Sequence, residues 1–240
     1  LCRDYSNSTL RAAHEKALQP QAHSCVSRTA RKPSNKRLAN GMNILITGAS
    51  GMIGSALRTR LIESGHQVFC LSRSDDSTPF HYDPKNERVH ISKDTDLDAV
   101  VNLAGANIAD KRWNTKRKEE ILKSRARLTR ALSLALSECQ NPPHTLLSAS
   151  AIGFYGNQCA APADEGCPPG DDFLAEVSVR WEEATAAATH AGIRTVLLRF
   201  GLVLNADGGV LKNLVMPGGL AVVGRLGNGS HKISWISLAD

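Results

Sequence analysis

Short apolar runs and stretches with helical spacing alternate along the chain from residue 42 onward. Runs of strand length occur at residues 43–47, 68–71, 99–104, 144–150 and 195–204, and a further short strand is predicted at 88–91. Apolar residues recur at helical spacing over residues 52–65, 115–138 and 181–191. Because strands and helices alternate in this way, we predict an α/β domain with a doubly wound parallel sheet.

The first strand leads directly into three glycines at three-residue spacing, in the segment MNILITGASGMIGS at residues 42–55. Gly48 supplies the positive φ that a tight strand-to-helix turn requires. Gly51 leaves no Cβ where a pyrophosphate must approach, and Gly54 lets the helix pack closely on the strand. With the strand at 68–71 the segment makes a β-α-β unit of about 30 residues. This order of elements predicts a dinucleotide site with the phosphates at the helix N-terminus.

A second part of this site is predicted at the end of the strand at 99–104, where the sequence reads NLAG. Small residues at this place in the strand order let the backbone approach the ribose of a dinucleotide, whereas the alternative is a buried strand that ends in a glycine turn. The cofactor-binding residues predicted from the two segments are Gly48, Ser50, Gly51, Met52, Ile53, Gly54, Leu103, Ala104 and Gly105.

The choice between NAD and NADP depends on the residues that follow the second strand. An acidic residue there would accept hydrogen bonds from the ribose 2′-hydroxyl, whereas an arginine pairs with a 2′-phosphate. Here the strand runs into Ser72, Arg73 and Ser74, so we predict NADP rather than NAD, with Arg73 as its ligand. The alternative is a solvated arginine that is engaged by Asp75 or Asp76.

The net charge of +6 is concentrated in residues 1–41. That segment holds eight of the 29 basic residues and two of the 23 acidic ones, which leaves 21 of each from Met42 onward. The folded part is therefore neutral and lacks the basic surface of a nucleic-acid-binding protein. Residues 1–41 have no apolar periodicity and are predicted to be disordered, with the domain at 42–240. The leader is either an organellar transit remnant, which implies a plastid or mitochondrion, or a functionless extension on a cytoplasmic protein.

The cysteines, the histidines and the lengths of the apolar runs argue against a metal-binding protein and against a membrane protein. The six cysteines lack metal-ligand spacing and the eight histidines are dispersed, so we predict free thiols in a reducing compartment and no metal site. The apolar run at 195–204 is broken by Arg199 and is far shorter than the roughly 20 residues of a membrane span. We therefore expect a soluble protein that acts on a small molecule. The oligomeric state stays open.

Distinct sequence blocks follow one another from residue 46 to residue 236. They are ITGASGMIG at 46–54, NLAG at 102–105, ADKRW at 109–113, SASAIGFYG at 148–156, GDDFLAEV at 170–177, LLRFGLVL at 197–204 and SWI at 234–236. In this order the blocks resemble the extended short-chain dehydrogenase/reductase superfamily, and within it the atypical NAD-dependent epimerase/dehydratase-like group. The resemblance implies a Rossmann-like fold, a pyridine dinucleotide cofactor and an oxidoreductase or epimerase activity. Family members continue beyond the last block, so it also implies a C-terminal substrate part truncated at Asp240.

The resemblance further implies a proton-transfer set, with a Ser or Thr that orients the substrate hydroxyl, a Tyr as general acid and base, and a Lys four residues later. Ser150, at the end of the strand at 144–150, matches the first of these. When Glu182 is aligned with the Glu that often follows the Tyr-x-x-x-Lys motif, Leu174 and Ser178 occupy the Tyr and Lys positions. Neither residue can transfer a proton.

Tyr155 is the nearest tyrosine, and Cys159 stands four residues after it, so no lysine accompanies it from that position. Two function classes stay open. In the first, the protein is an NADP-dependent oxidoreductase or epimerase with Ser150 and Tyr155 as its catalytic polar groups. In the second, it is a dinucleotide-binding scaffold or regulatory protein that binds a partner.

Basic residues near the predicted cleft would hold an anionic substrate in the first class; they are Lys111, Arg112, Arg125 and Arg199. The alternative for Lys111 and Arg112 is a solvated loop. Arg199 interrupts an apolar strand and needs a partner, because an unpaired buried guanidinium costs several kcal/mol. That partner is either the substrate or a buried Glu182 or Asp172. Glycines between 218 and 229 are predicted to form part of a substrate lid.

Overall fold

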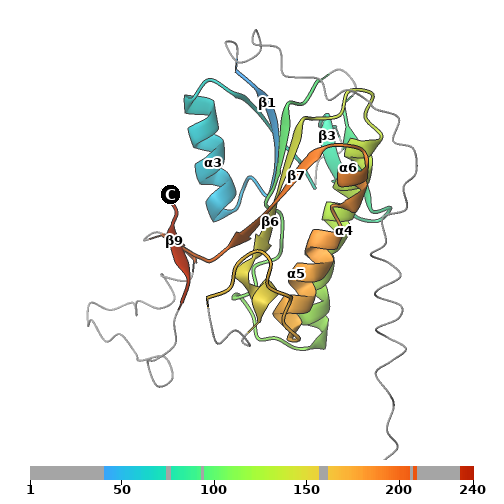
Figure 1. Ribbon diagram of the computed structural model, residues 1–240. Coiled ribbons are helices and arrows are strands. Elements are labelled where there is room, and N and C mark those ends of the chain that lie inside the picture. The colour runs from blue at the N-terminus through green and yellow to red at the C-terminus, as the bar shows by residue number, and fades with distance from the viewer. Residues whose placement is uncertain (1–40, 74–76, 93–94, 157–161, 206–207, 210–232) are drawn as a thin grey trace, which may run out of the picture. The chain divides into compact units, whose positions relative to one another are not determined.

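The computed structural model describes residues 41–73, 77–92, 95–156, 162–205, 208–209 and 233–240. By its internal contacts the chain divides into two units, residues 1–32 and 33–240, and every described residue belongs to the second. The predicted leader, apart from Gly41, and the predicted glycine-rich lid lie outside the described residues. Figure 1 shows the strands and helices of the second unit.

Five parallel strands form the central sheet in the order β2-β1-β5-β6-β7. They are β1 (Asn43–Thr47), β2 (Gln67–Cys70), β5 (Ala99–Asn102), β6 (Thr145–Ala151) and β7 (Arg194–Phe200). The chain adds β2 on one side of β1 and β5 on the other, which creates the switch point where open α/β sheets bind ligands. The predicted parallel sheet is confirmed.

The helix α3 (Met52–Glu63) covers one face of this sheet (Figure 1). Its residues Leu57 and Leu61 pack with Ile44 and Ile46 of β1 in a small apolar cluster. The fourth-residue spacing of the two leucines puts them on one side of the helix, as the sequence predicts.

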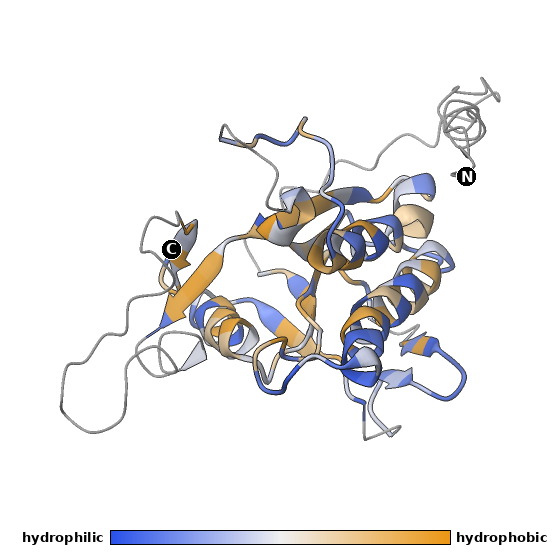
Figure 2. Cartoon of the chain, turned by 90° about the horizontal axis from the view of Figure 1, so that it is seen from below, coloured by the Kyte–Doolittle hydropathy of each residue, from blue (hydrophilic) through white to orange (hydrophobic). Residues whose placement is uncertain are grey.

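Among the described residues, the helices on the other face of the sheet are α4 (Thr115–Ser137), α5 (Phe173–Glu183) and α6 (Ala186–His190) (Figure 1). The apolar side of α4 supplies Leu128, Leu132 and Leu136 to the larger core cluster, which also contains Leu146 of β6 and Ala188 of α6. Figure 2 shows apolar strands between helices that carry both hydrophilic and hydrophobic residues. Helices on both faces make the sheet doubly wound, as predicted.

A strand that was not predicted from the sequence lies between β2 and the predicted strand at 88–91 along the chain. β3 (Phe80–Asp83) pairs antiparallel with the predicted strand β4 (Arg88–Ile91), and the two form a separate hairpin. Phe80 is 1% exposed, and its ring centroid lies 5.0 Å from that of Phe69 on β2. A strand of four residues inside a polar stretch has too little periodicity to stand out, although its alternate residues are buried.

The helix predicted at 181–191 is two helices in the structure. α5 ends at Glu183, α6 begins at Ala186, and α5 starts well before the predicted boundary, at Phe173. Asp172 caps this start, since its Oδ1 accepts from the Ala175 N–H at 2.9 Å.

The strand predicted at 195–204 is also divided. β7 ends at Phe200 and β8 (Leu202–Asn205) pairs in parallel with β9 (Trp235–Ser237) in a second small sheet. Gly201 lies between β7 and β8, and a Cβ on it would stand 2.7 Å from the Ser234 carbonyl oxygen. The close approach of the Ser234 backbone to Gly201 explains why the apolar run at 195–204 is divided into two strands.

A network of buried polar side chains joins β1, β5 and β6 to helices α4 and α5. Asn102 accepts a hydrogen bond from Thr47 Oγ1 at 2.7 Å and donates to Ser148 Oγ at 3.0 Å. It also donates to Thr129 Oγ1 at 2.8 Å, and Trp181 Nε1 donates to the same oxygen at 3.0 Å. Buried polar atoms that satisfy one another in this way specify one arrangement, so the network fixes the ends of β1 and β5 against the middle of β6.

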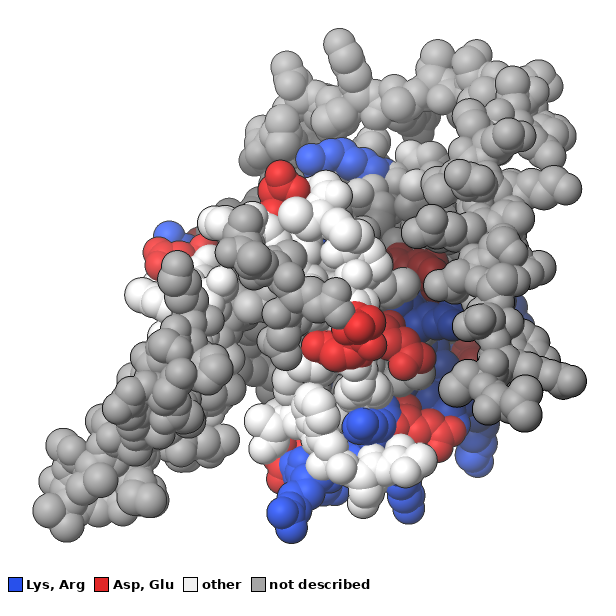
Figure 3. Space-filling model, turned by 60° about the horizontal axis from the view of Figure 1, so that its bottom comes forward, with Lys and Arg blue, Asp and Glu red and all other residues white. Residues whose placement is uncertain are grey.

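The surface of the described residues carries both charges. Figure 3 shows basic and acidic side chains interspersed on the face that it presents. None of the helices in the described ranges combines the length and apolar character that crossing a membrane requires. Within the same ranges, Cys70, Cys139 and Cys167 are free thiols, and no group of three or more metal-ligating side chains occurs.

Candidate functional site

Most of the predicted site residues gather at the edge of the sheet where the parallel strands end. The glycine turn follows β1, Arg73 follows β2 and Gly105 follows β5. Ser150 lies near the end of β6, and Tyr155 ends the short 3-10 helix η1 (Ile152–Tyr155) that comes after it. Ligands of open α/β sheets bind at this carboxyl edge.

The turn between β1 and α3 has the geometry that its glycines predict. Gly48 has a φ of 71°, in the left-handed region that favours glycine. A Cβ on Gly54 would lie 2.2 Å from the Gly48 carbonyl oxygen, so the first turn of α3 presses directly on the loop. Gly51 has a φ of -76° and is exposed, so its missing side chain leaves the front of the turn open.

The N-terminus of α3 fits an anionic group such as a pyrophosphate. Gly51 is the N-cap, no side chain caps the helix, and no acidic residue lies in its first turn. The first N–H groups of the helix, including those of Met52 and Ile53, lack intrahelical acceptors and form the positive end of the helix dipole. Because Ser50 and Gly51 are exposed, these donors are accessible to a ligand.

The segment from Leu103 to Gly105 forms a wall beside this turn. A Cβ on Gly48 would lie 2.8 Å from the Leu103 carbonyl carbon and 2.9 Å from the Ala104 nitrogen. Ala104 N–H donates to Thr47 Oγ1 at 3.2 Å, and Leu103 N–H donates to the Thr47 carbonyl oxygen at 3.1 Å. The two segments predicted to hold a cofactor therefore lie side by side, and Gly105 is exposed at their junction.

Arg73 comes three residues after the last residue of β2, and its side chain is exposed. Within the described part of the chain, the structure records no hydrogen bond or ion pair of this side chain. Asp75 and Asp76, the alternative partners, lie outside the described residues. The guanidinium is thus available at the place where a ribose 2′-phosphate would bind.

Four side chains form one connected set at the ends of β6 and β7. Ser150 Oγ donates to Glu182 Oε1 at 2.6 Å. Arg199 binds both oxygens of that carboxylate, through Nε to Oε1 and Nη2 to Oε2, each at 2.8 Å. Its Nη1 donates to the Tyr155 hydroxyl at 2.9 Å. The partner that the sequence left open for Arg199 is Glu182, whereas Asp172 caps α5.

The ion pair in this set is largely withdrawn from solvent, with the side chains of Arg199 and Glu182 at 18% and 10% exposure. Its hydrogen bonds to Glu182 raise the pKa of Arg199, and the Tyr155 hydroxyl adds to the rise although burial opposes it. The guanidinium carbon also lies 3.5 Å from the centroid of the Phe154 ring. Arg199 is therefore a fixed and permanently charged group beside the phenol.

Ser150 and Tyr155 differ in their access to solvent. Ser150 is 3% exposed and its hydroxyl hydrogen points to Glu182, whereas Tyr155 is partly exposed. A substrate at this edge can reach the phenol of Tyr155 more readily than the serine hydroxyl. Ser150 instead donates to the carboxylate that holds Arg199.

Arg125 of α4 lies against the wall at Gly105, where a Cβ would stand 3.0 Å from the guanidinium carbon. Burial lowers the pKa of Arg125 to about 10, and the charge of Arg117 adds to this effect, so the side chain is still protonated at neutral pH. It donates to the Ile121 carbonyl oxygen at 3.2 Å and lies 5.1 Å from the centroid of the Trp181 ring. Among the described residues no carboxylate pairs with it, so it suits a bound anion.

Sequence reasoning missed Arg117, which holds the ADKRW loop. Arg117 is 5% exposed and forms ion pairs with Asp110 of the loop and Glu120 of α4. The spacing of Arg117 and Glu120, three residues apart on a helix, is the signal that could have revealed the second pair. Lys111 and Arg112, predicted as substrate ligands, are exposed on the same loop.

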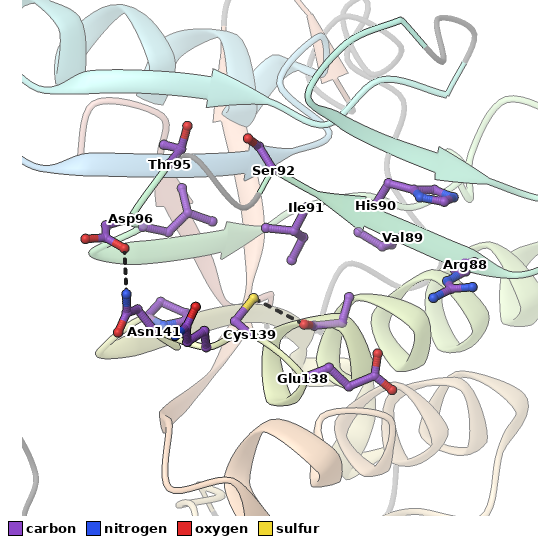
Figure 4. A pocket seen from close by; sticks show the side chains of 14 residues that line it. Arg88, Val89, His90, Ile91, Ser92, Thr95, Asp96, Glu138, Cys139 and Asn141 are labelled. Atoms are coloured by element: carbon purple, nitrogen blue, oxygen red, sulfur yellow. Dashed lines mark hydrogen bonds between the residues drawn. The ribbon is translucent and has the colours of Figure 1, made fainter.

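A separate pocket of about 440 Å³ lies at the opposite edge of the sheet (Figure 4). Its walls are β4, the residues before β5 such as Asp96, and the end of α4 with Glu138 and Cys139. Asn141 Nδ2 donates to Asp96 Oδ1 at 3.1 Å. Because the pocket borders the starts of β5 and β6, none of the predicted site residues lines it.

Comparison with known proteins relates this site to a family. The family model for the NAD dependent epimerase/dehydratase family matches residues 44–237. Epimerase family protein Mb2239 of Mycobacterium bovis is 40% identical over 205 residues, which cover 85% of this chain and 67% of that protein. Epimerase family protein SDR39U1 of Bos taurus is 33% identical over 202 residues, with 83% and 67% covered. The chain thus spans about two thirds of the length of these curated relatives.

Solved structures agree with this result. Human epimerase family protein SDR39U1 (isoform 2), crystallised with NADPH, superimposes with a TM-score of 0.70 at 32% identity, covering 83% of this chain and 67% of that one. The nucleoside-diphosphate sugar epimerase from Corynebacterium glutamicum superimposes with a TM-score of 0.66 at 35% identity, covering 83% of this chain but 42% of that one. The fold class and the resemblance seen in the sequence are confirmed. This chain belongs to the NAD dependent epimerase/dehydratase family.

Proposed function

We propose that this protein binds NADP(H) at the carboxyl edge of its sheet and is an oxidoreductase or epimerase that acts on a small substrate. The observation that carries the proposal is the open glycine turn at the start of α3, with its uncapped N–H groups beside Leu103 and Ala104. A side chain at Gly48 or Gly54 would fill the space on which this arrangement depends. The turn therefore fits a dinucleotide diphosphate held by backbone donors.

Arg73 supports NADP(H) over NAD(H). Its exposed guanidinium follows Ser72 at the end of β2 and can form two parallel hydrogen bonds to a 2′-phosphate. The human relative SDR39U1, which is 32% identical, was solved with NADPH, which supports the same choice here.

Tyr155 is the group that we propose to exchange a proton with the substrate. The nicotinamide of a bound cofactor supplies hydride transfer. When a substrate hydroxyl is oxidised, its proton would pass to the Tyr155 oxygen, which must be a phenolate beforehand, as the adjoining carbon gives up its hydride to the oxidised cofactor. In the reverse direction the Tyr155 hydroxyl returns the proton to the carbonyl oxygen.

Arg199 replaces the lysine of the Tyr-x-x-x-Lys motif as the positive charge beside the tyrosine. Its Nη1 donates to the Tyr155 oxygen at 2.9 Å, so a positive charge stands beside the atom that must lose its proton. Nε and Nη2 are both occupied by Glu182, which is itself bonded to Ser150. Glu182 and Ser150 are in this account positioning residues for Arg199 and Tyr155.

Arg125 is the cation that we propose to pair with an anionic group bound against Gly105. Its guanidinium is largely desolvated without a carboxylate partner in the described part of the chain, and an anion would compensate for this cost. Lys111 and Arg112 are exposed on the neighbouring loop and stay candidates for contacts to the same ligand.

A cofactor-binding scaffold is the second candidate function. Ser150 is 3% exposed and the Tyr-x-x-x-Lys pair is missing from its usual place, since Leu174 and Ser178 stand there. A protein of this kind would hold the dinucleotide and convert no substrate.

Titration of the full chain with NADPH and NADH, followed by fluorescence, tests the cofactor assignment. We expect tighter binding of NADPH, and we expect Arg73→Glu to weaken NADPH about tenfold or more while NADH changes little. Equal loss of both nucleotides, or no loss, would overturn the role of Arg73.

Incubation of the loaded protein with panels of carbonyl compounds and nucleotide sugars tests the activity. A substrate-dependent change in nicotinamide absorbance, or interconversion of two epimers, supports the enzyme. Retention of NADPH without conversion of any compound supports the scaffold.

A further inference from the structure

We propose that His81 of β3 is a specificity residue that binds the 2′-phosphate of NADP(H) beside Arg73. This inference rests on the proposed function and deepens it. β3 was not predicted from the sequence, and its place beside the end of β2 supports the proposal.

Backbone hydrogen bonds set His81 beside the end of β2. Ser72 N–H donates to the Phe80 carbonyl oxygen at 3.0 Å, and Tyr82 N–H donates to the Ser72 carbonyl oxygen at 2.8 Å. These two bonds make Ser72 and His81 partners in a parallel bridge. Partners in a bridge direct their side chains to the same face of the sheet, so the His81 side chain stands next to that of Ser72. Arg73 is the next residue along the chain.

The face that Ser72 and His81 share is the face of α3. Phe69 and Leu71 pack against the core cluster on the α4 side, whereas Val68 packs with the cluster that contains α3 residues. Since side chains alternate along a strand, Ser72 points the same way as Val68. His81 is therefore on the side of the sheet where the proposed cofactor site begins at the N-terminus of α3.

The imidazole of His81 has one nitrogen to offer to a ligand. Its Nδ1 lies 3.2 Å from the Thr78 carbonyl oxygen, and because a carbonyl can only accept, Nδ1 is the donor in this contact. Nε2 has no hydrogen-bond partner among the described residues. The protonated ring would donate from Nε2, and a 2′-phosphate, which has only acceptors above about pH 6, matches it.

The ring of His81 is held in place by His90 of β4. The two rings are stacked, with centroids 4.2 Å apart and planes at 15°. His90 is one strand further from Ser72 and is exposed, so it supports the ring of His81 without reaching the ligand directly. Two stacked imidazolium ions would repel each other, and a phosphate favours the charge on the ring that touches it.

The charged residues next to His81 among the described residues come from the hairpin and from the end of β2. Asp83 and Arg88 oppose each other at the end of the hairpin, two residues along the strands, and Arg73 follows Ser72. Asp75 and Asp76 follow in the chain, outside the described residues. A phosphate that accepts from Nε2 requires the protonated ring, so binding of NADPH should strengthen as the pH falls, while binding of NADH should not.

The test compares full-length His81→Phe with His90→Phe as the matched control, because each keeps a flat ring in the stack. NADPH and NADH are titrated with both variants and the wild type at about pH 6.5 and about pH 8.5. For His81→Phe we expect about a tenfold loss of NADPH affinity at the lower pH, a smaller loss at the higher pH, and unchanged NADH affinity. For His90→Phe we expect changes below about twofold, because the Nε2 donor remains.

Two results would overturn the role of His81 and leave the proposed function intact. One is a His81→Phe protein that discriminates between the nucleotides as well as the wild type, and the other is an equal loss for NADPH and NADH, which would indicate a structural role. A wild-type protein that binds NADPH no more tightly than NADH would instead contradict the proposed function, and the role of His81 with it.

Discussion

Arg199 shows how one residue can join the packing of this domain to its chemistry. It stands in an apolar strand, and its charge is tolerated there because Glu182 binds it through two hydrogen bonds and Phe154 covers it. The remaining nitrogen of the guanidinium, Nη1, donates to the Tyr155 hydroxyl. The sequence predicted that Arg199 needs a partner, but the partner follows from the register that sets Ser150 against Arg199 and from the position of α5, which no local pattern contains.

Replacement of Arg199 should therefore affect stability and activity separately. Arg199→Met leaves the Glu182 carboxylate largely buried without its counter-charge, so we expect the free energy of unfolding to fall by about 3 kcal/mol in urea denaturation. Adding Glu182→Gln should recover part of that loss without restoring turnover. If Arg199→Met alone is as stable as the wild type in urea denaturation, the ion pair of Arg199 with Glu182 does not contribute to stability as a buried pair.

For Arg125 we predict the opposite effect on stability, because its charge is buried and no carboxylate among the described residues pairs with it. Arg125→Met should leave the thermal unfolding midpoint of the ligand-free protein unchanged or raise it, while the affinity for NADPH or for an anionic substrate falls about tenfold. Arg127→Met is the control, since Arg127 is 45% exposed and pairs with Glu87 at the surface. If Arg125→Met lowers stability and leaves binding intact, the residue is a packing group.

At the scale of elements, the sequence predicts best where an element is long or where its geometry needs a particular residue. The first strand, the glycine turn and α4 follow from apolar spacing and from the need for Gly48 and Gly54. β3 is too short to show its period, and the division of β7 from β8 depends on the backbone of Ser234, far along the chain from Gly201. Such contacts are tertiary, so local spacing does not reveal them.

The glycine turn offers a test at this scale. Gly54→Ala would bring a Cβ within 2.2 Å of the Gly48 carbonyl oxygen, so the loop must move. We expect a loss of about 2 kcal/mol in stability and at least about a tenfold loss of NADPH affinity.

Gly192→Ala is the matched control for the glycine turn. Gly192 has a φ of 82° but no atom within 4 Å of its added Cβ, so it should lose about 1 kcal/mol of stability and keep its nucleotide affinity. Equal effects of the two substitutions on binding would contradict a specific role of the turn.

At the scale of the molecule, the candidate site belongs to no single segment. β1, β2, β5, β6 and β7 all contribute residues to it because parallel strands end at one edge, and the buried network around Asn102 keeps the ends of β1 and β5 in register with β6. The alternation of elements in the sequence predicts this edge. It does not predict β3, which lies beside Ser72 after the end of β2, and so the residues beside Arg73 were not foreseen.

The central claim is that backbone N–H groups of the glycine turn bind the diphosphate of a dinucleotide. Amide correlation NMR spectra of the full chain, recorded as NADPH is added, test it directly. The account predicts that the largest shifts fall on the amides of residues 48–54 and 103–105. Unchanged spectra, or shifts confined to the pocket that Asp96 and Cys139 line at the opposite edge of the sheet, would contradict it.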